Sequence, residues 1–371
     1  MGQVKVAFSI QFFHSFSSGI LNVAIPLIMN ERKVDVVVIG LVFAAMPILM
    51  QFGRMLFATL SDFWGRKLFF FANGLFGTIS SLIYYVARTP LDFLFGKAAE
   101  GTKEGAIWAV NRPFLLEKNE GSWRALVHLR TIVYLGFALG NLVAGFLIVW
   151  LLFEGTMILC AFFGVIVVML SLLLTGERKE HFNLSKAVGF LDFRRKTRIF
   201  KLFIFLFFVT GLSYGFVGGY VIPLFLKNCG FDTTTIGLII GIQILVAGIF
   251  SYIFSKTSKM RQLILISGLL FSCTFILLSL ANPLTAVFLV IFFGFVQGAN
   301  AIGQEGMLSK VSNKESYGTD IGLLMIGLHI GETISSALAG LLIANWGFAA
   351  PFLIAALTYT IFYLTSYKVM D

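Results

Sequence analysis

The residues of this sequence that could perform chemistry are charged side chains inside long apolar stretches. Ionisable groups inside a membrane are costly, and they commonly mark ion or substrate pathways. Glu100, Glu104 and Glu332 carry carboxyl groups that could bind and release a proton, and His329 lies three residues before Glu332. We predict these four residues as candidates for proton coupling. Each also has a structural alternative, in which it is a satisfied polar contact.

Two ion pairs would account for some of these charges without any transport role. Lys97 and Glu100 are three residues apart, a spacing that lets two side chains meet on a helix. They could therefore simply neutralise each other. Glu104 could likewise form a structural bridge with Arg54 or Arg130.

Polar side chains also recur at helical spacing along several apolar stretches. On the first stretch, Gln11, Ser15, Ser18 and Asn22 step by four, three and four residues. Such stripes predict the lining of a cavity inside a helical bundle. The candidate cavity residues are His14, Asn22, Arg54, Lys97, Arg130, Asn141, Gln297 and Asn300. For His14 we favour a hydrogen-bonded position in the cavity wall over a proton carrier.

Other kinds of chemistry find little support in the sequence. Cys160, Cys229 and Cys273 lie far apart with no His nearby, which predicts neither a metal site nor a disulfide framework. The sequence contains no nucleotide-binding loop, nucleophile elbow or zinc-protease motif. We therefore expect no metal, no cofactor, no ATP-driven pumping and no enzymatic activity. The net charge of +10 is better explained by loops facing an anionic membrane surface than by nucleic acid.

The elements that must position these residues are membrane helices. Of 371 residues, 58% are hydrophobic and only 12% are charged, whereas soluble domains are about 45–50% apolar and about 25% charged. Twelve stretches are long enough to cross a bilayer as helices. They span residues 4–29, 36–60, 68–87, 91–112, 125–150, 156–174, 199–226, 233–254, 263–280, 284–304, 321–344 and 348–367. The sequence predicts an all-α polytopic membrane protein.

The long, basic connection at residues 175–198 divides the twelve stretches into two sets of six. We predict an amino-terminal six-helix bundle of residues 1–174, a cytoplasmic linker of residues 175–198 and a carboxy-terminal six-helix bundle of residues 199–371. With the amino terminus inside, twenty Lys and Arg residues face the cytoplasm and four face outward. The positive-inside rule therefore predicts an integral protein of the cytoplasmic membrane with both termini in the cytoplasm.

The two sets of six contain weakly similar segments. Asp35-Val-Val-Val-Ile-Gly-Leu41 opens the second stretch, and Asp232-Thr-Thr-Thr-Ile-Gly-Leu238 opens the eighth. Ala144-Gly145 and Ala339-Gly340 occupy corresponding places in the fifth and eleventh stretches. These matches predict two pseudo-symmetric bundles with a site between them near the middle of the membrane.

The loop after the second stretch reads Ala58-Thr-Leu-Ser-Asp62-Phe-Trp-Gly65-Arg66-Lys67. It resembles the signature loop of the major facilitator superfamily, at the place where that family carries it. Asp62 at a helix end could pair with Arg66 and cap backbone N–H groups, and Gly65 suits a tight turn. We predict Asp62, Gly65, Arg66 and Lys67 as a latch that controls conformation.

Positions in the loop and in the fourth and fifth stretches depart from the family's patterns. Ala58 replaces the usual first Gly of the loop, and Phe63 replaces the usual basic residue. In the fourth stretch, Lys97-Ala-Ala-Glu-Gly101 stands where the family has Arg-x-x-x-Gly, which keeps the charge but loses the planar guanidinium. The antiporter pattern of the fifth stretch is only echoed by Gly140-Asn-Leu-Val-Ala-Gly145, without its Pro.

The resemblance implies a secondary transporter that moves a small solute by alternating access between two bundles. We expect a proton gradient to drive it, with membrane lipid as its surroundings. Two substrate classes stay open. One set of first-half charges, Arg54, Lys97, Lys103 and Arg130 against Glu100 and Glu104, sums to +2, which favours an anionic or zwitterionic solute. The 42 Phe residues favour an amphipathic, drug-like compound. A different class, a transporter-like sensor or a lipid flippase, also stays open.

Overall fold

The computed structural model describes residues 2–118, 123–176, 196–257, 259–311 and 317–369, and its ordered elements in these ranges are helices. In chain order they are α1 (Gln3–Glu31), α2 (Val36–Trp64), α3 (Lys67–Val86), α4 (Pro90–Lys118), α5 (Trp123–Leu172), α7 (Arg198–Val217), α8 (Val221–Asn228), α9 (Thr233–Phe254), α10 (Met260–Leu278), α11 (Pro283–Val311), α12 (Tyr317–Trp346) and α13 (Ala349–Val369).

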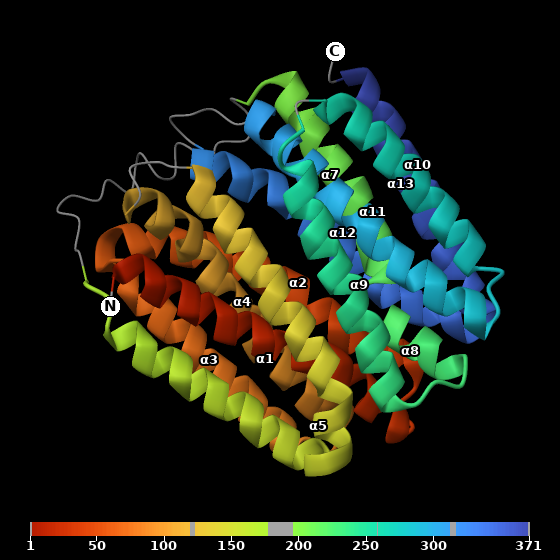
Figure 1. The fold of residues 1–371 in the computed structure, drawn as a ribbon, viewed down its shortest axis with the longest axis horizontal. Helices are drawn as coiled ribbons and strands as arrows, with labels where there is room; N and C mark the ends of the chain where they lie inside the picture. Colours follow the sequence, from red (N-terminus) through yellow and green to blue (C-terminus); the bar gives the residue numbers. More distant parts are fainter. Residues whose placement is uncertain (1, 119–122, 177–195, 258, 312–316, 370–371) are drawn as a thin grey trace.

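Helix α5 combines two of the predicted membrane stretches. Its 50 residues would extend about 75 Å if straight, far beyond the ~30 Å of a bilayer core. The helical path breaks at Leu152, whose φ of 59° and ψ of 178° are not helical, and Figure 1 shows α5 turning back on itself. The two arms of α5 thus correspond to residues 125–150 and 156–174.

Ten segments of the described residues are long and apolar enough to cross a membrane. The expected twelve differs from ten for two reasons. The two arms of α5 count as one segment, and α4 is too highly charged to count at all, since it carries Lys97, Glu100, Lys103 and Glu104. The fold is therefore all-α and rich in apolar helices, and the number twelve stays a prediction.

The helices pack as two groups that meet along two seams. In the first group α1 and α3 pack on α5, and α2 packs on α4; in the second, α7 packs on α12 and α13, and α11 packs on α9 and α10. The seams between the groups are α2 against α12 and α5 against α9. Helix α1 begins and α13 ends at the same end of this array (Figure 1).

The similar segments of the two groups pack crosswise at these seams. Asp35 and Asp232 each cap a helix, accepting hydrogen bonds from the backbone N–H groups of Val37 at 2.8 Å and Thr235 at 2.9 Å. A Cβ atom at Gly340 would lie 2.5 Å from the Val36 carbonyl oxygen at the start of α2. A Cβ atom at Gly145 would lie 2.5 Å from the Thr233 carbonyl oxygen at the start of α9. Each group therefore supplies the glycine on which a helix start of the other group rests.

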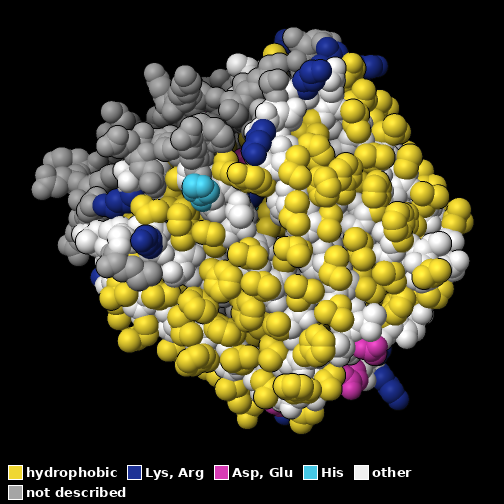
Figure 2. Space-filling view, in the orientation of Figure 1, with side chains coloured by type: hydrophobic (Ala, Val, Ile, Leu, Met, Phe, Trp, Pro, Cys, Tyr) yellow, Lys and Arg dark blue, Asp and Glu magenta, His cyan; other side chains and the backbone are white. Residues whose placement is uncertain are grey.

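The outer surface is suited to lipid. Hydrophobic side chains cover most of the face in Figure 2, and Lys and Arg gather toward the end where α1 begins and α13 ends. Large apolar side chains stand fully in the open, including Trp150, Leu280 and Leu284, which are 82–83% exposed. Exposure on this scale is a hazard in water and is normal at a lipid-facing surface.

Candidate functional site

Three charged side chains from α4, α5 and α11 meet where the two helix groups come together. The Oε1 atom of Glu305 on α11 lies 2.7 Å from Arg112 Nη2 on α4 and 2.7 Å from Arg130 Nη1 on α5. These side chains are 25–34% exposed, so water reaches them although they join two packed halves. The arrangement is an ionic link between the halves that bulk water can enter.

Arg54 on α2 adds a further positive charge to this cluster. Within the described part of the chain its guanidinium makes no hydrogen bond and no ion pair. The charges that act on it are those of Arg112 and Glu305, and it acts in turn on His329. Among these described side chains three arginines face a single carboxylate, an excess of two positive charges.

Polar groups of both halves border the cluster. Gln304 donates a 2.6 Å hydrogen bond to the Tyr214 hydroxyl, and the Arg130 guanidinium lies 5.8 Å from the centre of the Tyr134 ring. One and two turns earlier on α11, Asn300 is buried with neither amide atom partnered, and Gln297 accepts a hydrogen bond from Gln243 at 2.6 Å. Leaving a buried amide unpaired is costly, which makes Asn300 a candidate for contact with a bound molecule.

His329 lies on the face of α12 that meets α2, whereas the Glu332 carbonyl oxygen lies beside Gly215 of α7. Gln51 of α2 donates to the Gly322 carbonyl oxygen, so its own oxygen, 2.7 Å from His329 Nδ1, accepts a hydrogen bond from that ring nitrogen. One turn beyond Glu332, the Ser336 carbonyl oxygen accepts from the Tyr220 hydroxyl at 2.9 Å. The Glu332 carboxyl itself has no hydrogen bond and no ion pair with any described residue.

Glu104 is fully engaged inside the first helix group. Its carboxylate lies 3.2 Å from His14 Nε2 and accepts hydrogen bonds from Ser18 at 2.9 Å and Trp108 at 3.1 Å. Lys103 lies 3.7 Å from it and donates to Ser18. The pairing of Glu104 with Arg54 or Arg130 considered from the sequence is therefore wrong, because Arg54 and Arg130 face the gap between the halves.

Asn73 fixes how His14 bonds within this network. The Asn73 amide nitrogen donates to the Lys103 carbonyl oxygen at 3.0 Å and lies 2.9 Å from His14 Nδ1. His14 Nδ1 is therefore the acceptor and Nε2 the donor toward Glu104. This geometry makes His14 a satisfied structural residue.

Lys97 and Glu100 form an ion pair, as predicted by one of the two interpretations of the sequence. Their Nζ and Oε2 atoms are 2.8 Å apart, and the Tyr84 hydroxyl donates to the same oxygen at 2.7 Å. Lys97 also lies 4.3 Å from the centre of the Phe43 ring. Both members are nearly fully buried, at 2–3% exposure, so neither is presented to a solute in this arrangement.

Asn22 and Asn141 bridge α1 and α5 through one 2.9 Å hydrogen bond, from Asn22 Nδ2 to Asn141 Oδ1. Asn141 in turn donates to the Phe137 carbonyl oxygen at 2.6 Å. These two predicted cavity residues hold two helices together.

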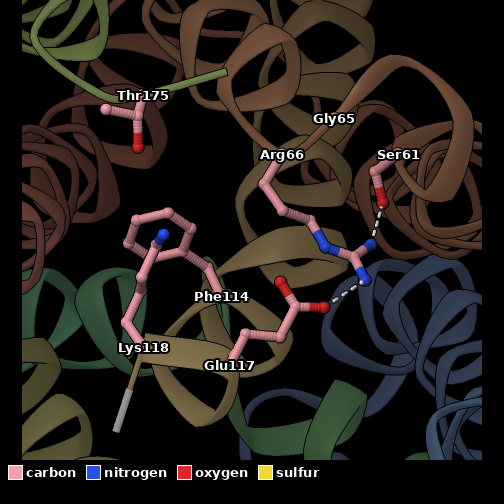
Figure 3. Close-up of a pocket in the computed structure, with 7 residues that line it drawn as sticks. All are labelled: Ser61, Gly65, Arg66, Phe114, Glu117, Lys118 and Thr175. Carbon is pink, nitrogen blue, oxygen red and sulfur yellow. Dashed lines mark hydrogen bonds and ion pairs between the residues drawn. The ribbon is translucent and has the colours of Figure 1, made fainter. Parts of the chain in front are cut away.

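The loop between α2 and α3 is braced by Arg66. Its guanidinium hydrogen-bonds to Ser61 and lies 3.1 Å from Glu117 Oε1 on α4, as Figure 3 shows. Gly65 has a φ of 81°, a conformation that favours glycine, and Lys67 donates to the Leu172 carbonyl oxygen at 2.8 Å. The side chain of Asp62 lies outside the described residues. The loop is thus tied to α4 and to the second arm of α5.

Two residues of the ionic link were missed from the sequence. Glu305 comes one residue after the predicted stretch 284–304 and is not among the predicted site residues, and Arg112 closes the stretch 91–112 and counts among the residues predicted to face the cytoplasm. The described part of the chain holds no cluster of three or more His, Cys, Asp or Glu side chains suited to a metal.

Comparisons with known proteins give one consistent result. Residues 7–300 and 203–369 match the family model described as Major Facilitator Superfamily. The fold is similar to that of a mutant of the nucleoside transporter NupG, with a TM-score of 0.82 at 14% identity over 100% of both chains.

Two further solved structures show the same fold. A POT family transporter in complex with 5-aminolevulinic acid has a TM-score of 0.78 at 13% identity, over 99% of this chain and 96% of that one. The human organic anion transporter MFSD10 (TETRAN) has a TM-score of 0.73 at 14% identity over 98% of each chain. A search of curated protein sequences gives no match.

Proposed function

This chain belongs to the major facilitator superfamily, and on that premise we propose that it is a proton-coupled secondary transporter of a small solute. The groups α1–α5 and α7–α13 would rock about a central site and open it alternately to each side of the membrane. We place the protein in the cytoplasmic membrane with both termini in the cytoplasm, as its distribution of Lys and Arg predicts.

The observation that carries the proton coupling is the isolation of Glu332. Within the described residues, Glu100, Glu104 and Glu305 each have cationic partners, whereas Glu332 has none. A lone carboxyl group at membrane depth, on a helix that meets the opposite half, is suited to take up and release a proton as the surrounding water changes. Glu100 and Glu104 are weaker candidates because their oxygens are already occupied.

Alternating access is supported by the two kinds of contact between the halves. The outer ends of the α2–α12 and α5–α9 seams touch backbone to backbone at Gly340 and Gly145. Near the opposite end, the halves are joined through the long side chains of Arg112, Arg130 and Glu305. Side-chain links of this kind can break and re-form as the halves move.

Flux measurements in proteoliposomes test this function. Purified protein is reconstituted with a pH-sensitive dye inside, and pooled anionic metabolites and pooled amphipathic cations are added separately. We expect one pool to change the internal pH and Glu332→Gln to abolish that change. The matched control Glu31→Gln, an exposed carboxylate at the end of α1, should leave it intact.

Two results would contradict the proposal. Proton-independent transport by the wild-type protein would remove the coupling. Binding of a solute without any net movement would instead indicate a sensor.

A further inference from the structure

We infer that the transported solute is an organic anion, preferentially a dianion, and that Arg54, Arg112 and Arg130 bind it. In the absence of solute, Glu305 occupies this arginine group in its place. This inference rests on the proposed transport function and names the substrate class of the same protein.

Glu305 contacts the arginines through only one of its two carboxylate oxygens. Both arginine contacts use its Oε1 atom, at 2.7 Å each, while Oε2 makes no hydrogen bond to a described residue. A carboxylate that satisfied two guanidinium groups would ordinarily use both of its oxygens. The arginines therefore hold more hydrogen-bonding capacity than Glu305 takes up.

The cluster also carries an excess of positive charge. Three guanidinium groups come from the first half, and the single carboxylate comes from the second. Arg54 has no hydrogen-bonded or ion-paired partner among the described residues. An unpaired guanidinium at membrane depth is costly. With Glu305 bound, the three arginines keep a net charge of +2, and a dianion in its place would lower it to +1, which a monoanion would not. Guanidinium groups suit this task because their planar donors match a carboxylate or a phosphate.

The solvent exposure of these side chains also favours them as the solute's binding groups. Arg112, Arg130 and Glu305 have side chains that are 25%, 29% and 34% exposed. Lys97 and Lys103, two other cations of α4, are each only 2% exposed and are bonded to Glu100 and Ser18. A solute entering between the halves therefore meets the arginines and not the lysines.

Solute binding and the contact between the halves are then coupled. Because the solute anion and Glu305 need the same guanidinium donors, binding one weakens the hold on the other. The solute would thereby loosen the link that ties α11 to α4 and α5. A neutral solute cannot displace Glu305 in this way.

Equilibrium binding of radiolabelled succinate to the purified full-length protein tests the inference. The competitors are succinamate and succinamide, which keep the shape of succinate but carry one and no negative charge. We expect affinity to fall about tenfold for each charge removed. If succinamide competes as well as succinate, or succinate does not bind, the inference is overturned.

Variants then locate the site. Glu305→Gln frees the arginines and should tighten succinate binding about tenfold, whereas Arg54→Gln should weaken it by a similar factor. Arg54→Lys, which keeps the charge, should lose less, and it serves if Arg54→Gln does not fold. Arg88→Gln, an exposed arginine at the other end of the molecule, should bind as the wild type does. If Glu305→Gln binds succinate no more tightly than the wild type does, Glu305 does not occupy the solute's place on the arginines.

Failure of this inference can be told apart from failure of the proposed function. Movement of amphipathic cations in proteoliposomes without succinate binding would overturn the anion site and leave the transporter standing. Succinate binding that depends on Arg54, without movement of any solute, would leave the anion site standing and overturn transport.

Discussion

The Glu305 carboxylate on α11 and the Arg112 guanidinium on α4 are 2.7 Å apart, although 193 residues separate them in the chain. With Arg130 on the same oxygen, this pair fastens one helix group to the other. The seams elsewhere include backbone contacts at Gly145 and Gly340 and the hydrogen bond between Gln51 and His329. The Glu305 pair involves side chains only, so it can be removed without disturbing a helix.

Removing this link should separate the halves near the ends of α4 and α11. In Glu305→Gln the charge-assisted bonds are lost, at a cost of about 1.5–3 kcal/mol, and Arg112 and Arg130 then repel each other. Spin labels at His128 on α5 and Ile199 on α7 should report a shift to longer distances. Raising the salt concentration should produce a smaller shift in the wild type. Identical distance distributions in the two proteins would contradict this prediction.

The Glu104 network should matter for stability more than for transport. Glu104→Gln leaves the buried Lys103 ammonium without its counter-charge, and breaking such a pair costs about 3–5 kcal/mol. We expect a marked fall in the unfolding temperature in detergent. The double variant Lys103→Met, Glu104→Gln should recover part of it, since no buried charge is then left alone. A stable single variant that no longer transports would instead assign Glu104 a direct role.

Asp232 should give α9 a pH-dependent cap. Hydrogen bonds from the Thr235 backbone N–H and hydroxyl groups lower the pKa of the Asp232 carboxyl below its ordinary value of about 3.9. Because the folded pKa is the lower one, the stabilisation is complete above the ordinary value and is lost as pH falls through the folded value.

Two substitutions test that cap through the unfolding temperature. Asp232→Ala should cost about 1 kcal/mol near neutral pH. Asp232→Asn should keep most of the cap but lose its dependence on acid. Equal acid sensitivity of the Asn variant and the wild type would show that other groups control the response.

The backbone contacts at the outer ends of the two seams leave no room for a methyl group on the glycine. Gly340→Ala places a Cβ against the Val36 carbonyl oxygen and should cost about 1–3 kcal/mol through overpacking. We expect the α2–α12 seam to open, so that a cysteine introduced at the buried Ser336 reacts faster with an impermeant thiol reagent. Gly322→Ala on the same helix has open space around it and should behave as the wild type. Equal labelling rates in the two variants would disprove the contact.

The sequence predicted relationships within one helix better than those between helices. Lys97 and Glu100 lie three residues apart, so helical geometry alone brings them within reach. Glu104 offered no such guide, because its partners His14 and Ser18 lie on α1 and their register against α4 depends on packing. Glu305 was overlooked because the end of an apolar stretch does not mark where a helix stops being enclosed by others.

The fold class and the family were predictable for a different reason. A mean hydropathy of +0.91 leaves few alternatives to membrane helices, and the loop around Gly65 and Arg66 carries its family resemblance in consecutive residues. The break in α5 falls between the predicted stretches 125–150 and 156–174, but nothing in the sequence indicates that Leu152, an ordinary apolar residue, takes the unusual conformation there.

The crosswise glycine contacts also bear on how such a chain can be assembled. In each half, the backbone at one glycine, Gly145 or Gly340, is covered by the first turn of a helix from the other half. The covering turn comes from the other half in both cases, so a half synthesised alone would expose the backbone at this glycine to lipid. Two separate polypeptides, cut within the connection between α5 and α7, should therefore be unstable singly and should accumulate when made together. The two halves would then depend on each other as the subunits of an obligate heterodimer do.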